Sequence, residues 1–315
     1  MSRPSIFVVC AAVAACLLNA CSINPPLDLS GMYPGQSRIQ LTSVPFFPQE
    51  AYQCGPAALA GVLGAAGVDI APSSLAPQVF LPGRQGSLQL ELLGASRRAG
   101  RIPYIIADDP GSLFAQLHAG RPVLVLQNLQ TRHFPIWHYA VLVGFDAESN
   151  SVFLNSGTEQ GLDMSAPSFL RTWDWAGRWA MVALRPGEMP AEVSLSPYLE
   201  AVAAFEEVAG GTASAPAWKA ALRQWPLDGR PYLALGNLAY ARGALAVAME
   251  YYRGGLVASP GDPALANNLA SVLGEAGSPQ EGMSILQPIL AAQPAASRWR
   301  VVMESTLAEL SAQLP

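Results

Sequence analysis

The sequence predicts an α+β domain followed by an all-α solenoid of helical repeats. An apolar helix near the start and a series of short apolar segments between turn signals predict the first domain. The second domain is predicted by Pro226, Pro260 and Pro294, which recur every 34 residues in an Ala-rich region. A chain of 315 residues is long enough for two such domains.

Residues 1–20 have the pattern of an export signal, in which Arg3 is the one charged residue before an apolar stretch. The stretch ends in Leu-Asn-Ala-Cys at Cys21, which resembles the lipobox of bacterial lipoproteins. In a lipobox, cleavage precedes the cysteine, and its thiol is then lipidated. We therefore expect Cys21 to carry a lipid anchor, with an ordinary secretory signal as the alternative.

The residue after Cys21 is Ser22, whereas an aspartate at this position typically retains lipoproteins at the inner membrane. The resemblance therefore implies a lipid-anchored protein of the bacterial outer membrane that faces the periplasm. Residues 21–37 are rich in Pro, Gly, Ser and Asn, which predicts a tether. The net charge of −5 and the lack of Lys/Arg runs disfavour nucleic-acid binding.

The α+β domain is predicted to span residues 38–187. A strand is expected over residues 39–46, and the helix that begins at Cys54 is expected to end at Gly67. Residues 72–86 show no apolar periodicity and predict a loop. Two further helices are predicted at residues 87–99 and 111–118. The remaining strands are predicted at residues 102–106, 123–129, 139–145, 152–155 and 179–184.

Cys54 is the most informative residue of this domain. It lies where an irregular segment becomes an apolar helix, so its thiol is at the positive end of the helix dipole, which favours the thiolate. Once the signal is removed and Cys21 is lipidated, Cys54 is the one remaining free thiol, which in an oxidising compartment usually has a chemical role. The amide of Gln49 could donate a hydrogen bond towards the same position, and Gln53 is a second candidate for that role.

A thiol nucleophile needs a base, and the chain has three histidines. His118 precedes a turn and is expected at the surface or at a helix C-terminus, where it complements the dipole. His133 lies in a loop and is expected to be solvated, but it is close enough in sequence to be a rival base. His138 begins an apolar strand, which would hold its imidazole rigidly. A hairpin through residues 146–151 would return Asn155 to the side of His138, where its amide oxygen could fix the tautomer of the ring.

These features together resemble the C39-like group of papain-fold cysteine peptidases, whose better-known members process double-glycine leader peptides. The resemblance covers about residues 38–185 and rests on the segments VPFFPQ at 44–49, CGPAAL at 54–59, HYAVLVGFD at 138–146 and the strand that ends at Asn155. It implies a papain-like α+β fold with Cys54 as nucleophile, His138 as general base and acid, and Asn155 as the orienting residue. Gln49 and the backbone N–H of Cys54 would form the oxyanion hole. Asn155 stands where that group usually has an aspartate.

Beyond Pro190 the composition changes to Ala-rich helical sequence. Gly236, Ala248 and Tyr252 occupy positions that a tetratricopeptide repeat uses, because small residues let paired helices approach and aromatic residues fill the gaps. A generic Ala-rich helical bundle is the alternative. The expected units are three repeats at residues 195–228, 229–262 and 263–296 and a capping helix at residues 297–315.

The resemblance implies an exported, lipid-anchored cysteine peptidase that acts on a peptide or protein, with cleavage after a Gly-Gly-type leader as a family-level expectation. The repeats would recruit the substrate or a protein partner. Acyl transfer from a thioester to an amine and an inactive scaffold are the alternatives. No metal or other cofactor is expected, because one free thiol and scattered histidines make no ligand cluster. Trp137 and Trp173 could line a peptide groove or pack in the core.

Overall fold

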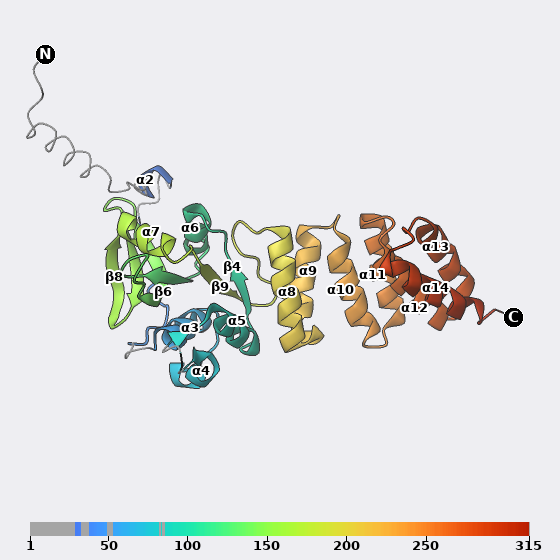
Figure 1. Cartoon of the computed structure of the whole chain (residues 1–315), viewed down its shortest axis with the longest axis horizontal. Coiled ribbons are helices and arrows are strands. Elements are labelled where there is room, and N and C mark those ends of the chain that lie inside the picture. Colours follow the sequence, from blue (N-terminus) through green and yellow to red (C-terminus); the bar gives the residue numbers. More distant parts are fainter. Residues whose placement is uncertain (1–28, 33–37, 49–52, 82, 84–85, 315) are drawn as a thin grey trace, which may run out of the picture.

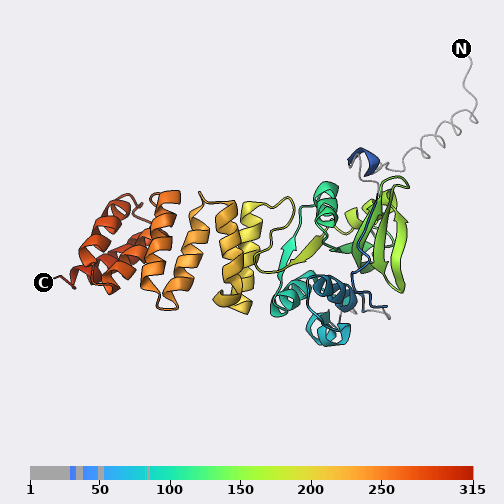
Figure 2. The same cartoon turned by 180° about the vertical axis from the view of Figure 1, so that it is seen from behind.

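The structure is a computed structural model of the chain, and it describes residues 29–32, 38–48, 53–81, 83 and 86–314. It shows a mixed α/β part followed by a row of helices that leads to the C-terminus (Figures 1 and 2). The predicted export signal, the predicted lipidation site Cys21 and the candidate oxyanion residue Gln49 lie outside the described residues. None of the helices in the described ranges is both long enough and apolar enough to cross a bilayer.

An antiparallel seven-stranded sheet forms the centre of the α/β part within the described residues. Its strands lie in the order β4-β9-β5-β6-β7-β8, and β1 also pairs with β6. The strands are β1 (Arg38–Gln40), β4 (Ile102–Ile105), β5 (Val123–Asn128), β6 (Trp137–Asp146), β7 (Ser151–Ser156), β8 (Glu159–Ser165) and β9 (Ala180–Leu184). The α+β layout with an antiparallel sheet, which the sequence predicts, is therefore confirmed.

Helices cover both faces of the sheet. Alternate residues of β6 point to opposite faces: Ala140 and Leu142 join one core cluster with α6 and α7, and Tyr139 and Val141 join another with α3, α4 and α5. The face that a side chain of β6 occupies therefore decides which helices it can reach. The helices of this part are α2 (Leu29–Met32), α3 (Cys54–Ala65), α4 (Pro72–Val79), α5 (Gln89–Arg98), α6 (Pro110–His118) and α7 (Ala166–Asp174).

The predicted loop at residues 72–86 is wrong, because this segment holds α4 and a small hairpin of β2 (Phe80–Leu81) with β3 (Gly86–Ser87). A proline opens α4, and Leu75 and Val79, one turn apart, are its buried residues. Two apolar positions are too few to give a visible period. The pairing of Ser87 in β3 also delays α5 to Gln89, so Ser87 does not cap that helix.

Three further expectations about the elements differ from the structure. The strand expected over residues 39–46 is reduced to β1, which ends at Gln40. The sequence does not predict β8 or α7. Most residues of β8 are polar or exposed, so this strand lacks the apolar alternation that marks a half-buried strand. Residues 29–32 of the predicted tether form α2, whose Leu29 is fully buried in the core.

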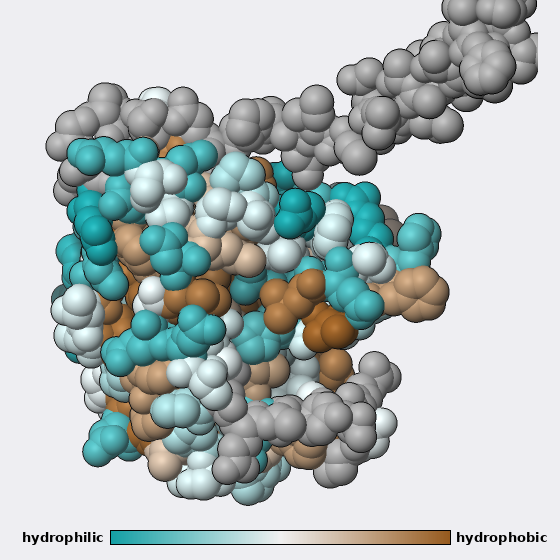
Figure 3. Space-filling model, turned by 90° about the vertical axis from the view of Figure 1, so that its left-hand side faces the viewer, coloured by the Kyte–Doolittle hydropathy of each residue, from teal (hydrophilic) through white to brown (hydrophobic). Residues whose placement is uncertain are grey.

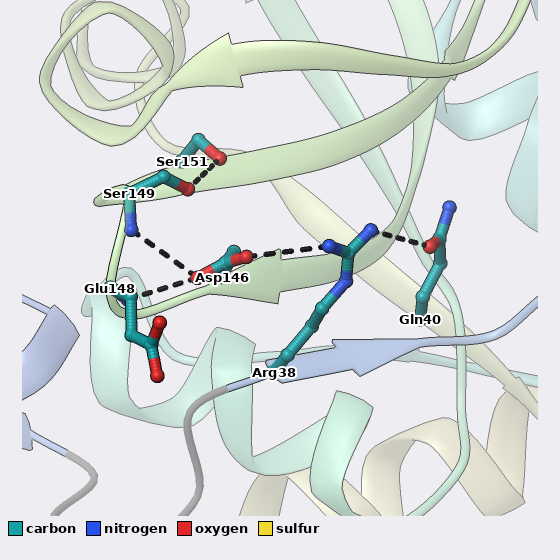
Figure 4. Close-up of polar contacts among 6 residues, drawn as sticks. All are labelled: Arg38, Gln40, Asp146, Glu148, Ser149 and Ser151. Carbon is teal, nitrogen blue, oxygen red and sulfur yellow. Dashed lines mark hydrogen bonds and ion pairs between the residues drawn. The ribbon is translucent and has the colours of Figure 1, made fainter.

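Polar contacts hold the turn between β6 and β7 and the neighbouring strand β1 (Figure 4). The guanidinium of Arg38 in β1 donates a hydrogen bond of 3.5 Å to the carboxylate of Asp146 at the end of β6. The other carboxylate oxygen of Asp146 accepts from the backbone N–H groups of Glu148 and Ser149, at 2.9 and 3.3 Å. Asp146 thus joins the turn to β1, and this contact helps to fix the start of β7, where Ser151 pairs with Asp146.

The helices after residue 194 form consecutive antiparallel pairs, and a last helix follows them. The first helices of two successive pairs, α10 and α12, begin 34 residues apart, at Gly229 and Pro263. The predicted close approach at Gly236 is confirmed, because a Cβ there would collide with the ring of Tyr252. The helices are α8 (Leu195–Ala209), α9 (Gly211–Gln224), α10 (Gly229–Tyr240), α11 (Leu245–Ala258), α12 (Pro263–Glu275), α13 (Pro279–Ala291) and α14 (Arg298–Ser311).

The helical part packs directly on the edge strand β4. The rings of Tyr104 in β4 and Tyr198 in α8 lie 6.4 Å apart between their centroids. The hydroxyl of Tyr198 donates to the carbonyl oxygen of Glu188 at 3.1 Å, and the hydroxyl of Tyr104 accepts from the backbone N–H of Ser194 at 3.3 Å. One core cluster continues from the sheet into α8 and α9. The first helical pair therefore shares its core with the α/β part.

Replacing Gly144 with alanine is expected to destabilise the protein, because the new Cβ would collide with the carbonyl oxygen of Ile39 in β1. Overpacking of this kind lowers the free energy of unfolding by about 1–3 kcal/mol. Gly94→Ala in α5 is the matched control, since its Cβ would approach the guanidinium end of Arg98 and alanine favours a helix. Urea denaturation measures both variants. Unchanged stability of Gly144→Ala would contradict the close approach of β1 to β6.

Candidate active site

Cys54 is the first residue of α3, and its thiol is half-buried and not in a disulfide. The residue before it, Gln53, caps α3 without a side-chain hydrogen bond, and the first turn contains no acidic side chain. Among the described residues, no side chain therefore neutralises the positive end of the α3 dipole where the thiol lies. The predicted placement of Cys54 at a helix N-terminus is confirmed.

Close packing holds α3 along its length. A Cβ at Gly64 would lie 2.7 Å from the ring of Pro45, so only glycine lets the segment before Cys54 cross the helix here. At the C-terminal end, the Nε atoms of Arg101 and Arg185 both donate to the carbonyl oxygen of Ala66 at 3.0 Å. Cations at this end complement the helix dipole. The position of Cys54 follows from these constraints on the helix that carries it.

The surroundings of Cys54 include Ser87 and Tyr139. A Cβ at Gly55 would collide with the side chain of Ser87, so β3 lies directly against the start of α3. The hydroxyl of Tyr139 donates a long bond of 3.4 Å to the carbonyl oxygen of Ser87. Burial, and then the negative charge of the Cys54 thiolate, raise the pKa of Tyr139 above its usual range. Reasoning from the sequence missed this tyrosine because an aromatic residue in a strand is usually a core residue.

His138 lies near the start of β6, opposite Gln127 of β5. Its Nε2 is 2.9 Å from Oγ of Ser156. Gln127 donates to Oγ1 of Thr172 in α7, so this pair lies on the α7 face of the sheet, whereas Tyr139 lies on the α3 face. Burial lowers the pKa of His138. Within the described residues, no hydrogen bond joins the imidazole to the Cys54 thiol.

The predicted contact between Asn155 and His138 is wrong in this structure. Asn155 is buried and lies opposite Val141, three residues along β6 from the histidine. Its Oδ1 accepts a 3.0 Å hydrogen bond from the backbone N–H of Gly161. Gly161 has φ of +68°, a backbone conformation that glycine readily adopts, and it lies beside the register shift between β7 and β8. Ser156, the next residue, bonds to the imidazole instead.

The other predicted candidates make no contact with the thiol that the described residues show. Gln49 lies outside the described residues, and Gln53, the residue before Cys54, is exposed. His133 is exposed in the loop between β5 and β6, as expected. His118 is the last residue of α6, as the alternative expects, and it is half-buried rather than fully at the surface. Its ring packs 5.5 Å from that of Phe145, and burial lowers its pKa.

The loop between β5 and β6 exposes apolar side chains next to His138. Trp137 is 55% exposed, whereas Trp173 is fully buried and donates from Nε1 to the carbonyl oxygen of Trp179 at 3.1 Å. Trp137 thus stays a candidate for a peptide groove, and Trp173 is a core residue. Hydrophobic side chains also reach the surface in several groups at the end of the molecule away from the helical row (Figure 3). The exposed apolar residues of the loop and of the first position of β6 are Leu129, Phe134, Ile136 and Trp137.

In the part of the chain that the structure describes, no metal cluster adjoins the thiol. No group of three His, Cys, Asp or Glu side chains in those residues could hold a metal ion. A cavity of about 300 Å³ lies at the C-terminal end of α3, where Arg121, Arg185 and Glu188 line it. It is at the opposite end of the helix from Cys54 and does not belong to the candidate site.

Comparison with solved structures finds two peptidases that resemble part of this chain. A protein described as a C39-like peptidase from Bacillus anthracis has 17% sequence identity and a TM-score of 0.39, and the match covers 47% of this chain and 97% of that chain. The peptidase domain of Streptococcus ComA, a bifunctional ABC transporter involved in a quorum-sensing pathway, has 20% identity and a TM-score of 0.36. That match covers 45% of this chain and 98% of the ComA domain.

A third similar structure is the type III secretion translocator chaperone SycD of Yersinia enterocolitica, in complex with a peptide of the translocator YopD. It has 21% identity and a TM-score of 0.35, with 39% of this chain and 98% of that chain covered. No curated protein matches this sequence.

The sequence comparison with protein families locates the candidate site within one of them. Residues 41–180 match the model of the Peptidase_C39 like family. This range contains Cys54, His138, Asn155 and Ser156. Residues 41–180, less than half of the chain, thus resemble the Peptidase_C39 like family.

Proposed function

We propose that this protein is a cysteine peptidase and that the thiol of Cys54 attacks the carbonyl carbon of a peptide bond. The observation that carries the proposal is the position of the thiol. It is free, half-buried and on the first residue of a helix whose N-cap residue makes no side-chain hydrogen bond, in a region that resembles a peptidase-like family. The helix dipole at that position stabilises a negative charge on sulfur.

In the proposed reaction, His138 removes the proton from the Cys54 thiol as the sulfur bonds to the carbonyl carbon. The backbone N–H of Cys54 and the amide of Gln49 bind the oxyanion. The imidazolium then gives its proton to the leaving amine, the C–N bond breaks, and a thioester remains. Water, deprotonated by the same imidazole, hydrolyses the thioester and restores the thiol.

The proposal requires the imidazole to reach the thiol. His138 is the second residue of β6 and starts from the α7 face, so its imidazole would have to turn around the end of the strand towards α3. Catalytic geometry is often completed only when substrate is bound. The contact between His138 Nε2 and Ser156 leaves Nδ1 for the thiol. Ser156 is therefore proposed as the residue that orients the ring, in the role that the sequence suggested for Asn155.

An inactive scaffold is a second candidate, and one observation favours it. The imidazole of His138 bonds to Ser156, Asn155 bonds to Gly161, and the described residues show no hydrogen bond between thiol and imidazole. In this reading the α/β domain no longer reacts, and the helical part supplies the function by binding a protein.

We also propose that the helical part is a set of tetratricopeptide repeats that holds a peptide substrate or a protein partner. The 34-residue offset between helical pairs and the ring of Tyr252 against Gly236 support this assignment. The lipobox-like segment at Cys21 supports a lipid anchor, which would place the protein at the periplasmic side of the outer membrane.

Cys54→Ala is expected to abolish both peptide hydrolysis and iodoacetamide labelling, with an unchanged far-UV spectrum. His138→Ala is expected to lower hydrolysis about 10²–10⁴-fold, as for the loss of a general base. His118→Ala is the matched control, because His118 is half-buried on α6 and does not take part in the reaction. The probe is a peptide library from a bacterial proteome, read by mass spectrometry. Absence of wild-type hydrolysis, with equal labelling in His138→Ala, would support the scaffold.

Ser156→Ala and Asn155→Ala are expected to act differently. Ser156→Ala removes the hydroxyl that bonds to the imidazole, so hydrolysis should fall while stability changes little. Asn155→Ala leaves the N–H of Gly161 without its acceptor, so the free energy of unfolding should fall by about 1–3 kcal/mol. Urea denaturation and hydrolysis rates are measured on both variants. If Asn155→Ala loses more activity than Ser156→Ala while both variants are equally stable, Asn155 rather than Ser156 orients the imidazole.

The pH dependence of hydrolysis should reflect the buried imidazole. Burial lowers the pKa of His138, so its neutral form persists below the ordinary value of about 6.5. The acid limb of kcat/KM should therefore have its midpoint below about 6.5. A midpoint clearly above this value would contradict His138 as the base in this environment.

The same pKa shift affects folding. As pH falls below about 6.5, the unfolded state takes up a proton that the folded state does not, so stability falls towards the lower pKa of the folded state. His138→Gln should reduce this loss of stability between pH 7 and pH 5. His118 is the other half-buried histidine, and burial also lowers its pKa. The variant His118→Gln therefore measures how much of the loss of stability between pH 7 and pH 5 comes from His118.

A further inference from the structure

Tyr139 occupies a position beside Cys54 that the proposed reaction does not use. It lies on the α3 face of β6, in the core cluster against which Cys54 packs. Its ring contacts Trp179 edge-on, with 5.9 Å between the ring centroids. The side chain is therefore held at a fixed place on the helix side of the sheet. His138, the residue before it, starts from the other face.

The hydroxyl of Tyr139 is held only loosely by its present partner. Its bond to the carbonyl oxygen of Ser87 is 3.4 Å long, beyond the usual range for a hydroxyl donor. Ser87 in turn lies against Gly55, the residue after Cys54, which has no room for a side chain. The phenol is thus placed at the start of α3 and has a hydrogen that is not firmly bound.

A second hydroxyl at the same place has no partner. Oγ of Ser87 is buried from solvent and makes no hydrogen bond within the described residues. Buried polar groups are normally paired, so these two hydroxyls leave donor capacity for an acceptor beside the thiol. A thiolate is such an acceptor, because it accepts hydrogen bonds and has lost its own donor.

The described groups that approach the start of α3 are uncharged, which is consistent with a neutral hydrogen-bond donor to the thiolate. Of the described groups with a resolved shift, Tyr139 alone has a pKa that responds to the charge on Cys54. Ser87 of β3 and Leu92 of α5, which approach Gly55, are uncharged. The raised pKa keeps the phenol protonated, and thus able to donate, across the whole range in which a thiol ionises.

We propose that the hydroxyl of Tyr139 donates a hydrogen bond to the thiolate of Cys54 and is a further catalytic residue of this site. The inference rests on the proposed role of Cys54 as nucleophile. No proton changes owner in this contact: the thiol proton goes to His138, and the phenol keeps its own. The bond that the phenol donates to the carbonyl oxygen of Ser87 holds it until the thiolate forms, and the hydroxyl then turns to the sulfur.

The test compares Tyr139→Phe with the wild type in the full chain. This variant keeps the ring against Trp179 and removes only the hydroxyl. Iodoacetamide labelling of Cys54 is followed from pH 5 to pH 10. The expected result is an upward shift of the half-maximal labelling pH by about one unit, which is about tenfold slower labelling below the midpoint.

Tyr198→Phe is the matched control. Tyr198 is also a buried tyrosine, and its hydroxyl bonds to the carbonyl oxygen of Glu188. It lies in α8, where it cannot touch Cys54, so its profile should equal that of the wild type. An unshifted profile in Tyr139→Phe, or equal shifts in both variants, overturns the inference.

A second substitution covers the case in which Tyr139→Phe does not fold. Incorporation of 3-fluorotyrosine at position 139 keeps the hydroxyl and makes it a stronger donor. The midpoint of labelling should then move to lower pH, and an unchanged or raised midpoint overturns the inference.

Peptide hydrolysis is measured in parallel. Hydrolysis by the wild type with an unshifted Tyr139→Phe profile rejects this inference alone, whereas no hydrolysis by the wild type rejects the proposed function.

Discussion

The packing of α3 against the sheet is the constraint on which the candidate site depends. The helix contains small residues where other elements cross it, so Gly55 meets Ser87 and Gly64 meets the ring of Pro45. Larger side chains at these positions would push the helix off the sheet and move Cys54 with it. At the other end, two arginines bind the carbonyl oxygen of Ala66. These contacts therefore fix both the position of α3 and the direction of its dipole, and the thiol lies at the positive end of that dipole.

Local signals in the sequence predict the parts of the fold that bury a continuous apolar face. The helix at Cys54, the central strands and the helical pairs beyond residue 194 all have such faces. The signals fail where burial is sparse: α4 buries two apolar residues, and β8 is mostly polar. These segments form because tertiary contacts with α3 and β7 complete them, and such contacts leave no period in the sequence.

The candidate site shows the same limit at the level of single side chains. The position of Cys54 depends on one helix boundary, which local sequence marks well. The partner of His138 depends on strand register, and β6 contains a register shift between Leu142 and Gly144. A shift of one residue changes which side chain reaches the imidazole. Spacing alone could therefore suggest Asn155 but could not distinguish it from Ser156, which makes the contact.

The electrostatics of the site favour neutral partners for the sulfur. Burial lowers the pKa of His138 and raises that of Tyr139, so both side chains are uncharged near neutral pH. A thiolate at Cys54 would then be stabilised chiefly by the dipole of α3 and by neutral donors, rather than by an adjacent imidazolium. A neutral imidazole is also the form that can accept a proton. Burial of both rings therefore serves one purpose, because it keeps the base available and the donor protonated while the helix stabilises the charge.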